Sequence, residues 1–331
     1  LADGKACAAS LPCAIACAMS NTVLHPWIEN AILIYGPRKG GTTLFQNLLD
    51  GGSELFVYPA ELKLKFLAHT PELSPAEYFA QSKIPANDPA VVPRTAADGK
   101  WDPEAYFRHT REYNVSPEAF DRAGYEAAWK ADAATRQPVA SLVRKDAIRV
   151  FENSRFRGQS PRMWCAKEVG GHSGRVLHLW KSIFPSGRLL LITRDPLMVV
   201  RSVLQDRRRV GQRPSLWNII KQTYDPVAVN ATIARLSNSS DVFVLRYEDL
   251  VANPEATMRK VADFIGIAFT HHLTQPTLLG EPAVVRTSSR VEKSVFISDA
   301  KWTDDLTLRE KLVVGATHAI LKLWPGLGAK R

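Results

Sequence analysis

Five short runs of apolar residues recur along the chain, at residues 31–35, 55–58, 163–166, 189–193 and 242–246. Most of these runs are continuous rather than alternating, as is typical of strands whose two faces are both covered. Helical patterns follow most of them, and this alternation predicts a mostly parallel sheet with helices on both sides. We therefore expect an α/β fold.

Local signals place the boundaries of three helices. The helix after the first run carries one apolar stripe, formed by Leu44, Phe45, Leu48 and Leu49. After the fourth run, Asp195 can cap a helix and Pro196 can occupy its first position. After the fifth run, Asn253 and Pro254 repeat this signal, and Gly266 is expected to end that helix.

The segment from about residue 70 to residue 160 has a different pattern. Helix starts recur without convincing strands between them, at Ser74-Pro75, Asp102-Pro103 and Ser116-Pro117. We interpret the segment as a helical insertion, a lid or substrate platform, rather than a separate domain. The prediction is a single domain over residues 29–331, preceded by an extension over residues 1–28.

The N-terminal extension is apolar and rich in small residues between Ala6 and Met19, about the length of a signal-peptide core. Two interpretations stay open, the remnant of a signal or anchor and a frayed N-terminus. The chain starts at Leu1 rather than Met, which leaves room for a membrane anchor upstream of residue 1. The sequence has no C-x-x-C and no His pair near its cysteines, so we expect no metal site.

The first apolar run leads into a glycine-rich turn and then a helix, in the sequence ILIYGPRKGGTTLFQNLL. Residues 36–43 fit the phosphate-binding pattern G-x-x-x-x-G-K-[ST] at every position except the lysine, where Thr42 stands. Glycines let successive N–H groups converge on an anion, and the following helix adds its positive end. Thr42 and Thr43 can add hydroxyl donors, and Lys39 should reach the group beyond a bound phosphate.

The missing lysine changes the expected ligand. That lysine would bridge the β- and γ-phosphates of a nucleoside triphosphate, so Thr42 disfavours a triphosphate kinase or ATPase. A ligand with a shorter phosphate chain fits better. The alternative is a chance glycine-rich turn, but the strand before it and the helix after it favour a phosphate site.

The turn resembles the 5′-phosphosulfate loop of sulfotransferases that use 3′-phosphoadenosine 5′-phosphosulfate (PAPS), which is [KR]-[SG]-G-T-[TRS] after a strand. The Arg-Lys-Gly-Gly-Thr sequence is most similar to that of the heparan sulfate sulfotransferases. The residues that flank it resemble those of the carbohydrate, protein-tyrosine and bacterial sulfotransferases. The resemblance covers about residues 31–312. It implies a P-loop NTPase-like sheet flanked by helices, and PAPS binding by Arg38, Lys39, Gly40, Gly41, Thr42 and Thr43.

The family binds the 3′-phosphate of PAPS with an Arg at a strand end and a Ser eight residues later, and Arg194 and Ser202 match that pair. Their placement also makes sense without the family. Arg194 follows a predicted parallel strand, at the edge where α/β sheets bind ligands, and offers bidentate donors to a phosphate. Ser202 lies about two helical turns further on, on roughly the same face. Val199 replaces a further Arg of many members, with Arg201 as a candidate substitute.

Sulfuryl transfer to a hydroxyl needs a base for the proton and cations for the charge on the sulfonate and leaving oxygens. Lys39 is the candidate charge stabiliser. Glu61 is the candidate base, because the resemblance places a catalytic Glu about 22 residues after the loop lysine, as Glu61 is from Lys39. Lys167 resembles a family lysine near the transferred sulfonate. Glu168 and then His172 are alternative bases, and a helix-start carboxylate is the alternative role for Glu61.

Two further segments resemble the family. One begins with Tyr-Glu-Asp-Leu after the fifth run, where Tyr247 is a candidate adenine contact. The other resembles a C-terminal loop of bacterial-type members, in which Ser288, Ser289 and Lys301 could close over the cofactor or be solvated loop residues.

The net charge of +10 suggests a polyanionic partner. With the cluster Arg207-Arg208-Arg209 it favours an acidic glycan, so we expect a carbohydrate hydroxyl as the acceptor. The alternatives are a small-molecule kinase and a non-catalytic protein that binds heparin or nucleic acid. The paired anion sites and Glu61 favour the enzyme, so we expect no nucleic-acid partner. The compartment stays open, a Golgi lumen in a eukaryote or the cytoplasm in a bacterium.

Overall fold

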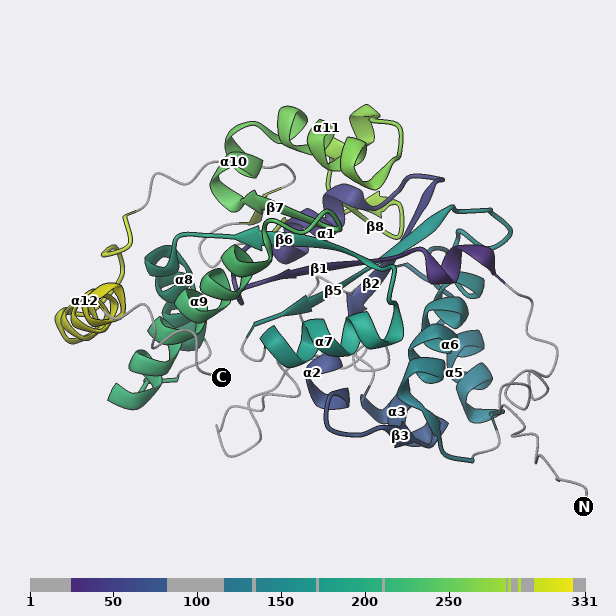
Figure 1. The fold of residues 1–331 in the computed structure, drawn as a ribbon, viewed down its shortest axis with the longest axis horizontal. Helices are drawn as coiled ribbons and strands as arrows, with labels where there is room; N and C mark the ends of the chain where they lie inside the picture. The colour runs from purple at the N-terminus through teal and green to yellow at the C-terminus, as the bar shows by residue number, and fades with distance from the viewer. Residues whose placement is uncertain are drawn as a thin grey trace, which may run out of the picture.

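The computed structural model describes residues 25–81, 116–132, 135–170, 173–209, 212–283, 285–286, 291–292 and 301–323. Its centre is a five-stranded parallel sheet in the order β2-β5-β1-β6-β7 (Figure 1). These strands are β1 (Ala31–Gly36), β2 (Leu55–Glu61), β5 (Met163–Val169), β6 (Arg188–Thr193) and β7 (Val242–Arg246). All five predicted apolar runs form strands of this sheet, which confirms the predicted α/β fold.

Helices and three small antiparallel strand pairs complete the described fold. The helices are α1 (Thr42–Leu49), α2 (Leu64–Leu67), α3 (Pro75–Gln81), α5 (Arg122–Lys130), α6 (Val139–Glu152), α7 (Ser173–Ile183), α8 (Pro196–Arg209), α9 (Leu216–Leu236), α10 (Tyr247–Ala252), α11 (Pro254–Ile265) and α12 (Leu308–Leu323), with 3-10 turns η1 (Pro26–Glu29) and η4 (His271–Thr274). The short strands are β3 (Glu72–Leu73) with β4 (Gln137–Pro138), β8 (Thr277–Leu278) with β9 (Glu281–Pro282), and β10 (Val285–Arg286) with β11 (Val291–Glu292). Among the helices of these described segments, none is both long and apolar enough to cross a membrane.

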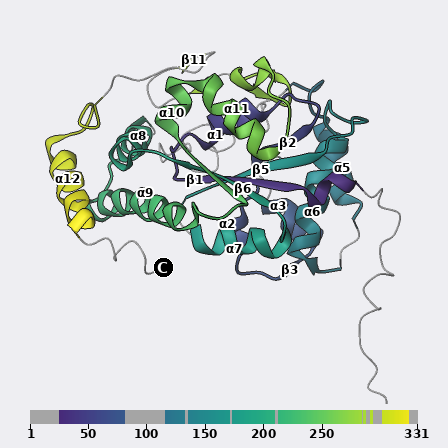
Figure 2. The ribbon, with the colours of Figure 1, turned by 45° about the horizontal axis from the view of Figure 1, so that its top comes forward.

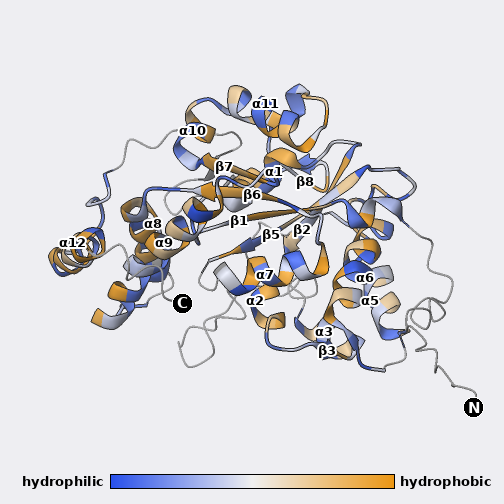
Figure 3. Ribbon diagram, in the orientation of Figure 1, coloured by the Kyte–Doolittle hydropathy of each residue, from blue (hydrophilic) through white to orange (hydrophobic). Residues whose placement is uncertain are grey.

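Alternate residues of each strand enter two different hydrophobic layers. On one face, Ile32 and Ile34 pack with side chains of α1, α10 and α11. On the other face, Leu33 and Tyr35 pack with side chains of α6, α7 and α9. Figures 1 and 2 show these helices on opposite sides of the sheet, and Figure 3 shows that the strands themselves are predominantly hydrophobic. Burial on both faces explains why the apolar runs are continuous.

The helix after β6 begins as its sequence predicts. The Asp195 carboxylate accepts hydrogen bonds from the N–H groups of Leu197 (2.7 Å) and Met198 (3.2 Å), and α8 starts at Pro196. The prediction for α11 is right in its bounds, because the helix starts at Pro254 and Gly266 follows it with a φ of 74°. The expected cap is wrong, because the Asn253 side chain makes no capping hydrogen bond there.

The first predicted helix of the insertion is confirmed. At the start of α3, the Ser74 hydroxyl accepts from the Glu77 N–H (3.2 Å), and the Glu77 carboxylate accepts from the Ser74 N–H (2.7 Å). This reciprocal pair satisfies two backbone donors that a helix start leaves unpaired. The predicted start at Asp102-Pro103 lies outside the described residues.

The helix start predicted at Ser116-Pro117 is wrong. The Ser116 hydroxyl caps a single turn by accepting from the Ala119 N–H at 3.1 Å. The chain then forms an isolated bridge between Phe120 and Ser154, and a new cap at Asp121 begins α5 instead. Long-range pairing thus overrides a local helix signal.

A buried carboxylate joins the insertion to the sheet. Asp146 of α6 accepts hydrogen bonds from Tyr58 of β2 (2.7 Å), Tyr78 of α3 (3.0 Å) and Tyr125 of α5 (2.6 Å). Burial raises the pKa of Asp146, and the three phenolic donors oppose that rise. These tyrosines belong to the same hydrophobic cluster as the strand residues Leu33 and Tyr35.

Candidate active site

The glycine-rich turn lies between β1 and α1, at the carboxyl edge of the central strand. Gly41 has a φ of 97°, in the left-handed region, and a Cβ built on it would lie 2.3 Å from the Tyr247 ring. Glycine is therefore required there both for its backbone and for its lack of a side chain. Lys39 also has a positive φ, of 60°, which is uncommon outside glycine and recurs at ligand-binding sites.

The first turn of α1 meets a charged residue of the neighbouring strand. Lys167 of β5 is fully buried, and its ammonium group donates a hydrogen bond to the Thr43 hydroxyl at 2.7 Å. Burial of an ammonium group is costly unless it is hydrogen-bonded, and this bond to Thr43 places the Lys167 charge beside the loop. Thr42 is also buried, at the start of the same helix.

Glu61 lies beside Lys167 in the sheet. It is the last residue of β2, and after a register shift it stands opposite Lys167 of β5. The Leu62 N–H donates to the Lys167 carbonyl at 3.2 Å, which extends the pairing past the strand end. The Glu61 side chain is almost buried. Two of the predicted catalytic residues, Glu61 and Lys167, are thus brought together at the ends of neighbouring strands.

Glu168 lies on the other face of β5. The pairing of β1 with β5 is regular from Ala31 to Gly36, so consecutive residues of β5 point to opposite faces. Lys167 faces α1, and Glu168 therefore faces the opposite layer, where its carboxylate accepts from the Val169 N–H at 3.0 Å. This placement favours Glu61 over Glu168 as the residue near the loop. His172 lies outside the described residues.

Arg194 directly follows β6 and contacts the loop. Its guanidinium group donates to the Lys39 carbonyl at 2.7 Å and stacks over the Tyr247 ring, 4.1 Å from the ring centroid. The Asn230 side chain donates to the Arg194 carbonyl at 2.9 Å, which fixes the backbone at this point. Burial lowers the pKa of Arg194, and the neighbouring Tyr247 and Glu248 oppose this effect.

Ser202 lies on α8 and is almost buried. Arg201, the candidate substitute for the missing Arg, is turned toward the C-terminal segment. Its guanidinium donates to the Asp304 carbonyl (3.1 Å) and to the Asp305 carboxylate (2.7 Å). The observed partners of Arg201 are therefore protein oxygens.

One charged partner of the loop is not apparent from the sequence. The Lys39 ammonium pairs with the carboxylate of Asp206, also on α8, at 2.9 Å. Asp206 follows Ser202 by four residues, so both lie on one face of the helix. That spacing is the only sequence signal for Asp206, and it has meaning only once α8 is known to border the loop.

The family model described as the sulfotransferase family matches residues 31–271. The chain belongs to the sulfotransferase family. This match spans the glycine-rich turn and every strand of the central sheet. A comparison with curated proteins finds no match.

Solved sulfotransferases have a similar fold. The sulfotransferase domain from the curacin biosynthetic pathway is 16% identical, with a TM-score of 0.50, over 88% of this chain and 96% of that chain. The sulfotransferase domain from the Synechococcus PCC 7002 olefin synthase is 16% identical, with a TM-score of 0.48, over 88% and 94%. Retinol dehydratase in complex with androsterone and the inactive cofactor PAP is 13% identical, with a TM-score of 0.41, over 90% and 82%. The first of these and the family match support the P-loop NTPase-like fold of this sulfotransferase.

The arginines of the cluster predicted to bind an acidic acceptor have different partners in this sulfotransferase. Arg208 pairs with Glu310 of α12 at 3.3 Å. Burial lowers the pKa of Arg207, and the nearby Arg38 guanidinium lowers it further. Arg38 is exposed on the loop. Because it lies near Arg207, these two arginines together place positive charge beside the site. The side chain of Arg209 lies outside the described residues.

The remaining candidates come from the two C-terminal segments that resemble the family. Tyr247 lies against the loop, as described above, and the Lys301 N–H donates to the Asp304 carboxylate at 2.7 Å. Ser288 and Ser289 lie outside the described residues.

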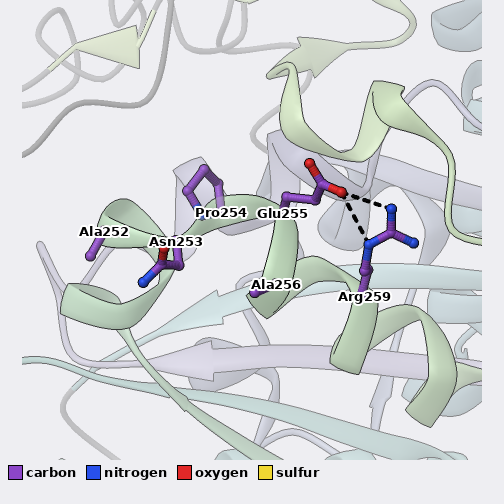
Figure 4. Close-up of a pocket in the computed structure, with 6 residues that line it drawn as sticks. All are labelled: Ala252, Asn253, Pro254, Glu255, Ala256 and Arg259. Carbon is purple, nitrogen blue, oxygen red and sulfur yellow. Dashed lines mark hydrogen bonds and ion pairs between the residues drawn. The ribbon is translucent and has the colours of Figure 1, made fainter.

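A shallow hollow of about 320 Å³ lies at the start of α11 (Figure 4). It is lined by Ala252, Asn253, Pro254, Glu255, Ala256 and Arg259. The Glu255 carboxylate and the Arg259 guanidinium, one turn apart on α11, form an ion pair at 2.7 Å. None of the predicted site residues lines this hollow, so it is separate from the loop site.

Proposed function

We propose that this sulfotransferase takes a sulfuryl group from PAPS and transfers it to a hydroxyl of a carbohydrate. The observation that carries the donor assignment is the hydrogen bond between Arg194 and the Lys39 carbonyl. It joins two groups, far apart in sequence, that the chemistry of PAPS requires together: a loop for the 5′-phosphosulfate and an arginine for the 3′-phosphate.

The donor set fits such a ligand. The loop from Gly40 to Thr43 offers backbone N–H groups and hydroxyls at the start of α1, where the helix dipole favours an anion. Arg194 and Ser202 offer the donors for the 3′-phosphate. Bound PAPS would supply an activated sulfuryl group, whose bond to the 5′-phosphate oxygen is broken in the transfer.

The remaining roles follow from charge and position. Lys39 and Lys167 stabilise negative charge on the sulfonate oxygens and on the leaving phosphate oxygen. Glu61 accepts the proton of the acceptor hydroxyl. The pairing of Glu61 with Lys167 in the sheet supports this division, because it puts a carboxylate and an ammonium at neighbouring strand ends.

The carbohydrate assignment rests on electrostatics. The net charge of +10 and the exposed Arg38 near Arg207 suit an acidic glycan, which an extended basic surface attracts. The proposal includes a single domain over residues 29–331, whose insertion forms a lid or platform for this acceptor.

A sulfate-transfer screen tests the acceptor. Labelled PAPS is offered with acidic glycans, neutral glycans, tyrosine peptides and small phenols, and the labelled product is measured. We expect transfer to glycans, with acidic ones preferred. Transfer only to peptides or phenols would contradict the carbohydrate assignment, and absence of transfer to the whole panel would contradict the proposed activity.

A further inference from the structure

We propose that Asp206 holds the Lys39 ammonium in the nucleotide-free sulfotransferase and competes with the donor's phosphosulfate for it, so that ligand binding must break this ion pair. The inference rests on the proposed function of the loop as a phosphate cradle and concerns how that same site is controlled.

The ion pair is sheltered rather than solvated. The Lys39 and Asp206 charges lie 2.9 Å apart, and the two side chains are 26% and 9% exposed. Pairs on open surface contribute little because water and salt screen them, whereas a sheltered pair interacts more strongly. A ligand anion must therefore compete with the Asp206 carboxylate for the Lys39 ammonium.

Lys39 is fixed at its backbone and can move at its side chain. Its carbonyl accepts from Arg194, and its φ of 60° sets the direction in which the side chain leaves the loop. Its four-carbon stem allows the ammonium to swing between two anions without any change in the loop.

Asp206 is held in place by the rest of α8. Arg201 of the same helix is bonded to Asp304 and Asp305, and Arg208 is bonded to Glu310. These contacts tie α8 to the C-terminal segment on both sides of Asp206. The carboxylate is therefore a stationary partner, and the lysine is the group that changes partners.

We expect the Lys39–Asp206 ion pair to weaken the apparent affinity for a phosphate ligand. A protein whose binding-competent state is only partly populated binds with an affinity reduced by that fraction. Removing the Asp206 charge should make Lys39 available at all times and so tighten binding of a phosphate ligand.

A double-mutant cycle tests this coupling. Calorimetry measures the Kd of 3′-phosphoadenosine 5′-phosphate for wild type, Asp206→Asn, Lys39→Ala and the double variant. We expect Asp206→Asn to lower Kd by roughly three- to tenfold. In the Lys39→Ala background, the same substitution should change Kd by less than about twofold, because the residue through which Asp206 acts is gone.

Two results would overturn the proposal. Unchanged or weaker binding by Asp206→Asn would make Asp206 a support for Lys39 rather than a competitor. Equal tightening in both backgrounds would show only that a negative charge had been removed near an anion site. Asp206→Ala serves as a second variant if melting curves show that Asp206→Asn does not fold.

Asp241→Asn is the matched control. It removes the same charge from another lysine pair, between Lys181 and Asp241, at the start of β7 and thus at the opposite edge of the sheet. We expect it to leave Kd unchanged.

Inorganic pyrophosphate, which needs only the loop, separates this inference from the proposed function. If the nucleotide does not bind but pyrophosphate shows the cycle, the PAPS assignment fails and the inference stands. If the nucleotide binds without coupling between Lys39 and Asp206, the inference alone fails.

Discussion

At the scale of single residues, the register of neighbouring strands decides which charges meet. Glu61 and Lys167 stand opposite each other on β2 and β5, and Lys167 reaches Thr43 at the start of α1. Glu168, only one position further along the strand, faces the other layer. A shift of β5 by one residue would therefore turn Lys167 away from α1 and put Glu168 in its place.

This register predicts different effects for the two carboxylates. Glu61→Gln keeps the shape of the side chain and removes its capacity to accept a proton, so turnover should fall at least roughly 100-fold. Affinity for 3′-phosphoadenosine 5′-phosphate should be nearly unchanged, because the base acts in the chemical step. Glu168→Gln, assayed in parallel, should be milder. A reversed ranking in steady-state kinetics would move the role of the base to Glu168.

The loop lysine should act mainly on turnover at saturating donor. Lys39→Ala removes a cation proposed to stabilise transition-state charge, so kcat should fall by about 100-fold or more. Lys39→Arg should keep part of the rate, since it retains the charge. If Lys39→Ala turns over like wild type at saturating PAPS while remaining folded, Lys39 has no part in the chemistry.

Residues of the site differ in how far sequence alone could identify them. The loop glycines, Arg194 and Ser202 belong to local patterns with a chemical meaning. Asp206 does not, because an acid within a charged helix end is ordinarily a solvated group. Only the packing of α8 beside the loop gives Asp206 its partner.

At the scale of elements, the end of α1 is fixed by a second buried carboxylate. Asp50 accepts hydrogen bonds from the Thr277 hydroxyl (2.8 Å) and the Gly280 N–H (2.7 Å), which tie the β8–β9 hairpin to α1. Burial raises the pKa of Asp50 from its ordinary 3.8 to about 6. The hydrogen bonds from Gly280 and Thr277 oppose that rise.

This raised pKa predicts a pH-dependent stability. The unfolded chain loses the Asp50 proton at a lower pH than the folded protein, so the free energy of unfolding should fall as the pH rises from about 4 to about 6. The loss is of the order of 2–3 kcal/mol, from about 1.4 kcal/mol per pKa unit. Asp50→Asn keeps an acceptor oxygen and should remove this component. Urea unfolding of both proteins across that range measures it, and parallel curves would refute it.

Element boundaries also show where local signals are insufficient. Ser74-Pro75 and Ser116-Pro117 are the same dipeptide, yet only the first begins a helix. The second is followed by Phe120, whose bridge to Ser154 draws the chain away after one turn. The strands were predicted well because burial on both faces leaves continuous apolar runs. Two strands extend further than their apolar runs predict. The polar residues Glu61 and Lys167 still belong to β2 and β5.

At the scale of the whole molecule, the helical insertion and the sheet share one buried polar centre. Asp146 of α6 satisfies the hydroxyls of Tyr58, Tyr78 and Tyr125, which come from the sheet and from two helices of the insertion. Such a network is stabilising only while every member has a partner. It therefore couples the insertion's position to β2, the strand that ends at Glu61.

Loss of this centre should destabilise the protein more than loss of any one contact. Asp146→Ala leaves three buried hydroxyls without their acceptor, at about 1–3 kcal/mol each, so the free energy of unfolding should fall by at least about 3 kcal/mol. Tyr125→Phe removes one donor only and should cost roughly 0.5–1.5 kcal/mol. Denaturant unfolding measures both, and equal effects of the two substitutions would show that the tyrosines do not act through Asp146.

The central claim is that two anion sites, the loop and Arg194 with Ser202, bind one nucleotide with phosphates at both ends. Calorimetric titration of 3′-phosphoadenosine 5′-phosphate against 5′-AMP tests it most directly, because the two ligands differ only in the 3′-phosphate. The wild-type protein should prefer the 3′-phosphorylated nucleotide, and Arg194→Ala should reduce that preference by roughly 1.5–3 kcal/mol, as for hydrogen bonds to charged groups. Equal affinity of the wild-type protein for the two nucleotides would contradict the account.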